Sequence, residues 1–184
     1  MQKKGKIAGI IRARMGSSRL PGKVISDIAG IPSIKLMINR LEKCQLLDGV
    51  IVATSNDASD DILCDFLIEN NFDFFRGDET DVLKRVLSAA QEKNINHIVR
   101  LTGDCPLIDP LVVDKCVFEY IQDLKLDYIS STTLSNNYPR GQDVEVFSEK
   151  SLGAIDSFIE LNSEFREHVS LYIYTEGITQ KIIS

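Results

Sequence analysis

Residues 7–23 of this 184-residue chain read IAGIIRARMGSSRLPGK. The segment from Ile7 to Ile11 is apolar throughout, which predicts a buried strand. The loop that follows it concentrates four cations, two hydroxyls and two glycines. Glycines let backbone N–H groups approach an anion closely, and ligands of open α/β sheets bind at the carboxyl ends of strands. This loop therefore predicts a polyphosphate site, and the alternative is a solvated basic loop.

The bulk composition is that of a single soluble globular domain. The chain is 43% hydrophobic, with a net charge of −6 and a pI of about 5.0. This acidic balance argues against a non-specific nucleic-acid binder. No apolar run approaches the ~18 residues of a membrane span, and no signal peptide is visible. Four cysteines without metal-binding spacing predict buried thiols in a reducing compartment, so we expect a cytoplasmic protein with no nucleic-acid or membrane partner.

Apolar runs of strand length alternate with segments of helical period along the chain. After the first strand, strands are expected at 50–53, 72–75, 97–101, 127–131, 143–147 and 178–183. Helical periodicity falls at 34–41, 62–67, 82–87, 113–121, 152–161 and 165–174. This alternation is typical of βαβ units and predicts an α/β fold with a mostly parallel sheet.

Polar clusters follow several expected strands, at 12–23, 54–57, 76–78 and 102–104. Two common nucleotide-binding motifs do not fit them. Gly16 and Gly22 enclose five residues rather than the four of a P-loop, and Val24 stands where that motif needs a hydroxyl. The G-x-G-x-x-G of a dinucleotide site is also missing after the first strand.

The loop 12–23 resembles the signature of the cytidylyltransferases that activate acidic sugars, the CMP-sialate, CMP-Kdo and CMP-nonulosonate synthetases. The likeness is greatest to the SpsF-like branch, named for spore-coat polysaccharide biosynthesis. Further stretches agree with that branch in the same order: FRGD at 75–78 with DVLKR at 81–85, RLTGDCPLID at 100–109, YPRGQDVEVF at 138–147 and REHV at 166–169.

The resemblance implies a nucleotide-diphospho-sugar transferase fold of Rossmann-like type, with three layers and helices on both faces of a mostly parallel sheet. It implies one domain over 1–184 that transfers CMP from CTP to an acidic sugar of the nonulosonic type and releases pyrophosphate. Mg²⁺ is the implied cofactor. A homodimer is the implied assembly, with 138–175 as the candidate dimerisation or sugar-facing segment.

The resemblance also implies roles for individual residues. Arg12, Lys23 and Asp104 are the implied catalytic residues, with Asp104 as the Mg²⁺ ligand because an ionised carboxylate suits a hard cation. The implied nucleotide-binding residues are Arg12, Ala13, Arg14, Gly16, Ser17, Arg19, Lys23, Ala53, Thr54, Ser55, Arg76, Thr102 and Gly103. The implied sugar-binding residues are Arg140, Gln142, Asp143 and Glu145.

Simpler interpretations stay open for several of these residues. Asp104 also fits an ordinary turn after a strand, and Ser55 fits a helix cap. Arg76 also fits a surface ion pair. The alternating segment 143–147 also fits a solvated edge strand with its polar residues outward.

One departure from the family pattern affects the expected activity. The acidic-sugar synthetases usually place a second metal carboxylate on a late strand, beyond the point where this chain ends at Ser184. We therefore expect either a chain truncated at its C-terminus or a site built with fewer acids. Two alternatives follow: a non-catalytic nucleotide or nucleotide-sugar binding module of the same fold, and a nucleotidyltransferase that uses another NTP and a sugar 1-phosphate.

Overall fold

The computed structural model describes residues 5–17, 20–123, 126–131, 138–161, 163–175 and 180–182. Its main strands are β1 (Ile7–Arg12), β4 (Val50–Ser55), β5 (Phe74–Gly77), β6 (His97–Thr102), β7 (Tyr128–Ser130), β8 (Glu145–Ser148) and β9 (Gln180–Ile182). They form one seven-stranded sheet in the order β5-β4-β1-β6-β8-β7-β9. A separate hairpin joins β2 (Asp27–Ile28) to β3 (Ile31–Pro32).

The sheet is mostly parallel, as the alternation of strands and helices predicted. β1 pairs in parallel with β4 and with β6, and β4 pairs in parallel with β5. The exception is β8, which runs antiparallel to both β6 and β7. β8 lies between these two strands, so the interpretation of 143–147 as an edge strand is wrong.

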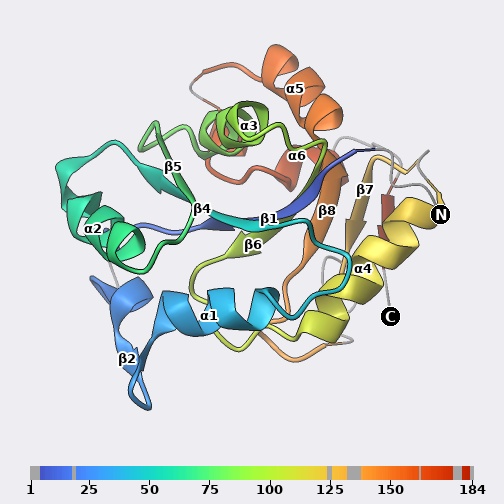
Figure 1. The fold of residues 1–184 in the computed structure, drawn as a ribbon. Helices are drawn as coiled ribbons and strands as arrows, with labels where there is room; N and C mark the ends of the chain where they lie inside the picture. The colour runs from blue at the N-terminus through green and yellow to red at the C-terminus, as the bar shows by residue number, and fades with distance from the viewer. Residues whose placement is uncertain are drawn as a thin grey trace.

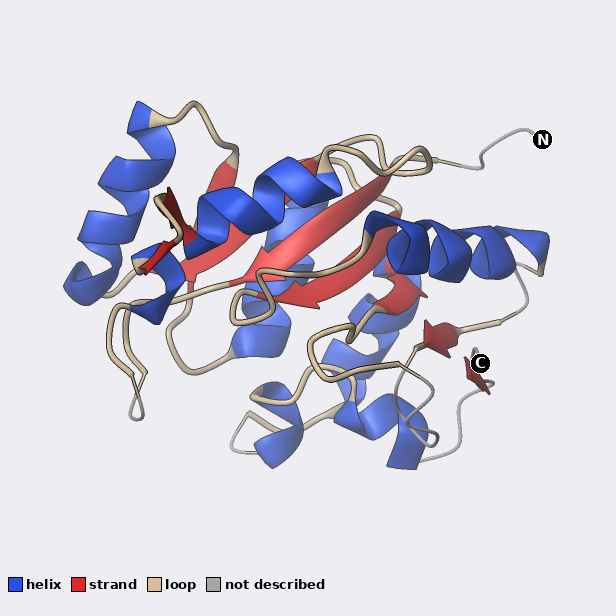
Figure 2. Ribbon diagram, turned by 90° about the horizontal axis from the view of Figure 1, so that it is seen from below, coloured by secondary structure: helices blue, strands red, loops and turns tan. Residues whose placement is uncertain are grey.

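Helices cover both faces of the sheet and give the expected three layers (Figures 1 and 2). One face packs against α1 (Ser33–Leu41), α2 (Asp61–Glu69) and α4 (Pro110–Gln122), and the other packs against α3 (Val82–Glu92), α5 (Glu149–Phe158) and α6 (Leu171–Thr175). Successive side chains of a strand point to opposite faces, so in β1 Ile7 and Ile11 join the first core while Ala8 and Ile10 join the second. The continuous apolar run of β1 reflects this burial on both faces.

The C-terminal part differs in detail from the sequence expectations. The helix expected at 165–174 is instead a 3₁₀ turn, η3 (Glu164–Arg166), followed by the short α6. The Arg166 side chain turns inward at η3, where its Nε donates to the carbonyl oxygen of Glu160 and its Nη2 to that of Ile159. A buried side chain, and not a continuous helix, therefore organises this segment.

The order of the strands reverses at β1. From β1 the chain continues to β4 and β5 on one side, and then returns to β6 on the other side of β1. Ligands of open α/β sheets bind outside the carboxyl ends of the strands at such a reversal. Arg12 and Thr102, the last residues of β1 and β6, are register partners there. The fold thus brings the segments 12–23 and 102–104 together.

The four cysteines are free thiols, and the prediction that they are buried is confirmed for three of them, while Cys105 is half-buried. Among the residues that the structure describes, no helix has the length and apolar character needed to cross a bilayer.

Candidate functional site

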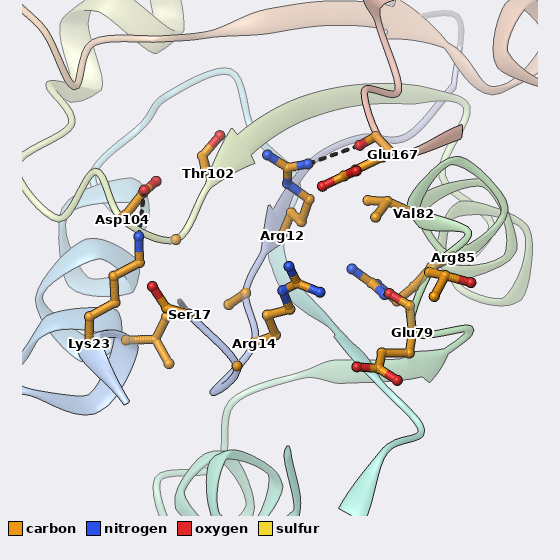
Figure 3. Close-up of a pocket in the computed structure, with 15 residues that line it drawn as sticks. Arg12, Arg14, Ser17, Lys23, Glu79, Val82, Arg85, Thr102, Asp104 and Glu167 are labelled. Carbon is orange, nitrogen blue, oxygen red and sulfur yellow. Dashed lines mark hydrogen bonds and ion pairs between the residues drawn. The ribbon is translucent and has the colours of Figure 1, made fainter. Parts of the chain in front are cut away.

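A cavity of about 500 Å³ opens at the carboxyl ends of β1 and β6 (Figure 3). Its wall comes from the loop after β1, the loop after β6, the segment between β5 and α3, the start of α3 and one residue of the segment before α6. The lining residues are Arg12, Ala13, Arg14, Gly16, Ser17, Lys23, Val24, Glu79, Thr80, Val82, Arg85, Thr102, Gly103, Asp104 and Glu167. The structure therefore gathers most of the site predicted from 12–23 and 102–104 around one cavity.

Lys23 and Asp104 lie together at one end of this cavity (Figure 3). Lys23 Nζ donates to Asp104 Oδ2 at 2.8 Å. Burial acts to raise the pKa of Asp104, but the hydrogen bond and the charge of Lys23 outweigh it and hold that pKa below its usual range. The carboxylate is thus ionised at neutral pH. Among the described lining residues Asp104 is the single carboxylate at this end of the cavity (Figure 3). Across the described residues, no group of three or more metal-ligating side chains gathers.

Gly103 allows the loop after β6 to contact the loop after β1. Its N–H donates to the carbonyl oxygen of Arg12 at 2.9 Å. A Cβ at position 103 would lie 2.9 Å from Ala13 Cβ and 3.1 Å from the same Arg12 oxygen, which is too close for a side chain to fit without displacing the backbone. The missing side chain therefore sets how closely Asp104 approaches the loop after β1.

Three arginines, Arg12, Arg14 and Arg85, line the middle and far end of the cavity (Figure 3). Arg12 Nη1 donates to the carbonyl oxygen of Glu167 at 3.1 Å. Burial, together with the nearby charge of Arg100, lowers the pKa of Arg12 to about 10, which still leaves it cationic at neutral pH. Burial and the charge of Arg14 also lower the pKa of Arg85. This cluster of like charges favours an anionic ligand.

Arg85 is a lining residue that the sequence reasoning did not assign to the site. The signal that could have identified it is its position, because a cation at 85 falls on the buried face of α3 beside Val82 and Val86. A buried arginine on an amphipathic helix needs a polar environment. Here the cavity and the carbonyl groups of the preceding loop supply that environment.

Asp60 is a second residue that the sequence reasoning missed. One of its carboxylate oxygens accepts from the Met15 N–H at 2.6 Å, and the other accepts from Thr54 Oγ1 at 2.9 Å, the Ser55 N–H at 3.0 Å and the Ser55 hydroxyl. Burial acts to raise the pKa of Asp60, but these hydrogen bonds outweigh it, and the pKa is lowered. The carboxylate thereby ties the basic loop to the end of β4.

The predicted nucleotide-binding residues of β4 and β5 lie outside the cavity lining. The hydroxyls of Thr54 and Ser55 are buried against Asp60, and the Ala53 carbonyl accepts from the Ala13 N–H at 3.3 Å. Their nucleotide contacts stay predictions.

Arg76 is engaged in holding the turn after β4. Its guanidinium donates to the Ser55 carbonyl at 2.9 Å, the Asp57 carbonyl at 3.0 Å and Asp61 Oδ1 at 2.7 Å. A contact between Arg76 and the pyrimidine stays a prediction. Arg19 lies outside the described residues.

The four predicted sugar-binding residues also lie outside the cavity lining. Gln142 joins two loops, because its Oε1 accepts from the Asp109 N–H at 2.7 Å and its Nε2 donates to the Leu107 carbonyl at 3.1 Å. Arg140 and Asp143 are exposed, and Asp143 precedes the first residue of β8.

Glu145, the fourth of these residues, belongs to an internal network. It forms an ion pair with Arg100 and accepts from Tyr128 OH at 2.8 Å and Ser170 Oγ at 2.7 Å. Its carboxylate supports the sheet and the segment before α6. The sugar contacts of this residue and the other three stay predictions.

Comparison with known proteins supports the same family as the sequence motifs. The sequence model of the Cytidylyltransferase family matches residues 8–181. The spore coat polysaccharide biosynthesis protein SpsF of Bacillus subtilis is 34% identical over 168 residues, which cover 89% of this chain and 68% of that protein. A 3-deoxy-manno-octulosonate cytidylyltransferase of Geobacter sulfurreducens is 32% identical over 111 residues, or 60% of this chain and 44% of that protein.

Solved structures agree. A cytidylyltransferase from Leptospira borgpetersenii superposes with a TM-score of 0.90 at 33% identity, over 97% of this chain and 76% of that chain. A CMP:2-keto-3-deoxy-manno-octonic acid synthetase complexed with CTP shares the fold, with a TM-score of 0.74 at 20% identity over 97% of this chain and 89% of that chain. Together with the cationic cavity where the strand order reverses, these matches show that the chain belongs to the cytidylyltransferase family.

Proposed function

We propose that this protein transfers CMP from CTP to an acidic sugar, releasing pyrophosphate, for the biosynthesis of a surface polysaccharide or glycan. The observation that carries the proposal is the cationic cavity at the carboxyl ends of β1 and β6, with the ionised Asp104 at its edge. The name of one relative, for spore-coat polysaccharide biosynthesis, supports the surface polysaccharide, and the name of another, for a 3-deoxy-manno-octulosonate substrate, supports the acidic sugar.

In the proposed reaction a sugar hydroxyl oxygen attacks the α-phosphorus of CTP. The new bond joins that oxygen to phosphorus, the bond to the β-phosphate breaks, and the hydroxyl proton is released. This step requires in-line placement and neutralisation of the departing pyrophosphate. Lys23, Arg12 and Ser17 lie in the cavity wall where they would bind the phosphates, beside the backbone amides of the same loop.

The residues of this cavity fit a bound Mg²⁺ held by Asp104. Proteins commonly bind Mg²⁺ through one or two carboxylates together with substrate phosphates, and Asp104 is an ionised carboxylate whose side chain is 36% exposed. When bound, the ion would offset the negative charge of the phosphate oxygens. Lys23 would then donate to phosphate in place of Asp104. The other lining carboxylates, Glu79 and Glu167, lie toward the opposite end of the cavity (Figure 3).

The proposal includes one nucleotidyltransferase domain over 1–184 and a homodimer through the segment 138–175, both by analogy with the family. It also includes a cytoplasmic location, which the four free thiols support. Sedimentation velocity of the purified chain tests the dimer, because a monomer at micromolar concentration would contradict it.

Pyrophosphate release tests the proposed activity. The assay combines Mg²⁺, each of the four NTPs and a panel of acidic sugars and sugar 1-phosphates, with the variant Asp104→Asn in parallel. Release with CTP and one acidic sugar, lost in the variant, supports the proposal. Release with another NTP and a sugar 1-phosphate supports the alternative transferase. CTP binding by calorimetry without any release supports the non-catalytic binding module.

A further inference from the structure

Arg85 is a buried cation in the wall of the cavity, with only 1% of its surface exposed. Its place is kept open by Gly77, where a Cβ would lie 2.9 Å from Arg85 Cγ. Nη1 donates to the carbonyl oxygens of Asp78 and Glu79, the second at 3.1 Å. Nε is buried and has no hydrogen-bond partner among the described residues. A buried donor without an acceptor is costly, so a native structure that keeps one calls for an explanation.

No carboxylate within the described chain forms an ion pair with Arg85, although three acids lie near it. Asp60, Asp78 and Asp81 act to raise its pKa, but burial and the charge of Arg14 prevail. Each of these acids is engaged with other donors. Asp60 accepts from Met15, Asp78 accepts from the Thr80 N–H and hydroxyl, and Asp81 accepts from the Lys84 N–H and from Arg166.

The guanidinium of Arg85 points toward Arg12 and Arg14, across the cavity from the Lys23–Asp104 pair (Figure 3). The cavity thus has two cationic ends of different character. At one end Lys23 is neutralised by a carboxylate 2.8 Å away. At the other end three arginines lie close together, and in the described part of the chain neither Glu79 nor Glu167, the carboxylates that line this end, forms an ion pair with them. One of the arginines, Arg85, keeps a donor without an acceptor.

We propose that Arg85, with Arg12 and Arg14, forms a second anion subsite at the α3 end of the cavity, where the guanidinium of Arg85 donates to an anionic oxygen of a substrate. This inference rests on the proposed function, whose reaction brings two kinds of anionic group to the cavity. One is a phosphate group of the nucleotide and the other is the carboxylate of the sugar. Both offer anionic oxygens as acceptors for the guanidinium groups of these arginines.

Isothermal titration calorimetry without Mg²⁺ tests the subsite. The probes are inorganic pyrophosphate, CTP, N-acetylneuraminate as a sugar acid without phosphate, and cytidine as a neutral nucleoside. The proteins are the wild type, Arg85→Gln and Lys84→Gln. Lys84 is the matched control, because it lies beside Arg85 on α3 but is exposed, pairs with Asp156 and does not line the cavity.

We expect Arg85→Gln to weaken anion binding about tenfold or more, as the loss of a charge-assisted hydrogen bond predicts, while cytidine binding and Lys84→Gln stay unchanged. A loss confined to pyrophosphate and CTP assigns the subsite to phosphate. A loss confined to N-acetylneuraminate assigns it to the sugar carboxylate. Unchanged affinity for every anion overturns the subsite, and so does the failure of every anion to bind the wild type.

Arg85 also donates to the carbonyl oxygens of Asp78 and Glu79, so its replacement can shift this loop as well as remove a positive charge. An equal loss of cytidine affinity would show that Arg85 only positions this loop, which overturns the anion subsite. If circular dichroism shows that Arg85→Gln does not fold, Arg14→Gln tests the subsite instead, because Arg14 is exposed. Its replacement should weaken the binding of at least one of the anions and leave cytidine binding unchanged. Unchanged anion affinity in a folded Arg14→Gln overturns the subsite. Pyrophosphate release by the wild type tests the proposed function separately.

Discussion

Lys23 Nζ lies 2.8 Å from Asp104 Oδ2, so an ion pair joins the loop after β1 to the loop after β6 at one end of the cavity. The two side chains are 26% and 36% exposed, and ion pairs so accessible to water contribute little to stability. The pair instead brings together the cation that we propose binds phosphate and the carboxylate that we propose binds Mg²⁺. Without a ligand, each side chain partly neutralises the charge of the other.

Lys23→Ala is expected to weaken CTP binding roughly 30-fold, or ~2 kcal/mol, because it removes one charge-assisted contact to phosphate. Calorimetry with CTP measures the change. Lys35→Ala is the control, since Lys35 on α1 donates to Asn70 and does not line the cavity. Equal CTP affinity of Lys23→Ala and wild type would remove Lys23 from the phosphate site.

Asp104→Asn is expected to reduce Mg²⁺-dependent pyrophosphate release by at least ~100-fold, the scale of losing a group that stabilises transition-state charge. CTP affinity measured without metal should not fall, because the variant removes the carboxylate that competes with phosphate for Lys23. Steady-state kinetics and metal-free calorimetry check both statements. Retained activity with an unchanged circular dichroism spectrum would contradict the role of Asp104 in metal binding.

Gly103→Ala is expected to destabilise the protein by about 1–3 kcal/mol, the usual range for forcing an extra methyl into a packed site. Its Cβ would press on Ala13 and on the Arg12 carbonyl, so CTP affinity should fall as the two loops separate. Urea unfolding and calorimetry measure the two effects. Gly49→Ala is the control, since a Cβ at 49 meets nothing within 4 Å. Equal stability of the two variants would contradict the close approach.

Asp60 is expected to make the free energy of unfolding decrease as the pH becomes acidic. Because its pKa in the folded state lies below the unfolded value of ~3.9, its stabilising contribution is present above that pH and is lost as the pH falls through the folded pKa. Asp60→Asn should cost about 1–3 kcal/mol at pH 7, since an amide N–H₂ would face the donors of Met15, Thr54 or Ser55.

Urea unfolding between pH 7 and pH 3 measures this linkage. The wild type should lose stability more steeply than Asp60→Asn at the acid end of this range. Asp65→Asn is the control, because Asp65 is also a carboxylate but lies exposed on α2. Parallel profiles for wild type and Asp60→Asn would show that the carboxylate of Asp60 contributes no pH-dependent stability.

The alternation of apolar runs with helical periods correctly predicted the parallel strands β1, β4, β5 and β6 and the helices between them. Periodicity reports burial, and these elements are buried in a regular way on one or both faces. The same reasoning misassigned the segment 165–174. There the conformation depends on Arg166, whose Nη1 donates to Asp81 Oδ2. These two residues are 85 positions apart in the sequence, and a hydrogen bond between such distant residues produces no periodic pattern of apolar residues.

By itself, the sequence determined the fold class, the family and the position of the cationic loop, because strand-end position, glycines and local charge are properties of neighbouring residues. Only the tertiary structure decided which side chains face the cavity. It placed Arg85 in the wall, turned Thr54 and Ser55 toward Asp60, and used Asp60 to hold Met15, which lies 45 residues away. A side chain's direction follows from hydrogen bonds between segments far apart in the chain, and these form only when the sheet brings the strand ends together.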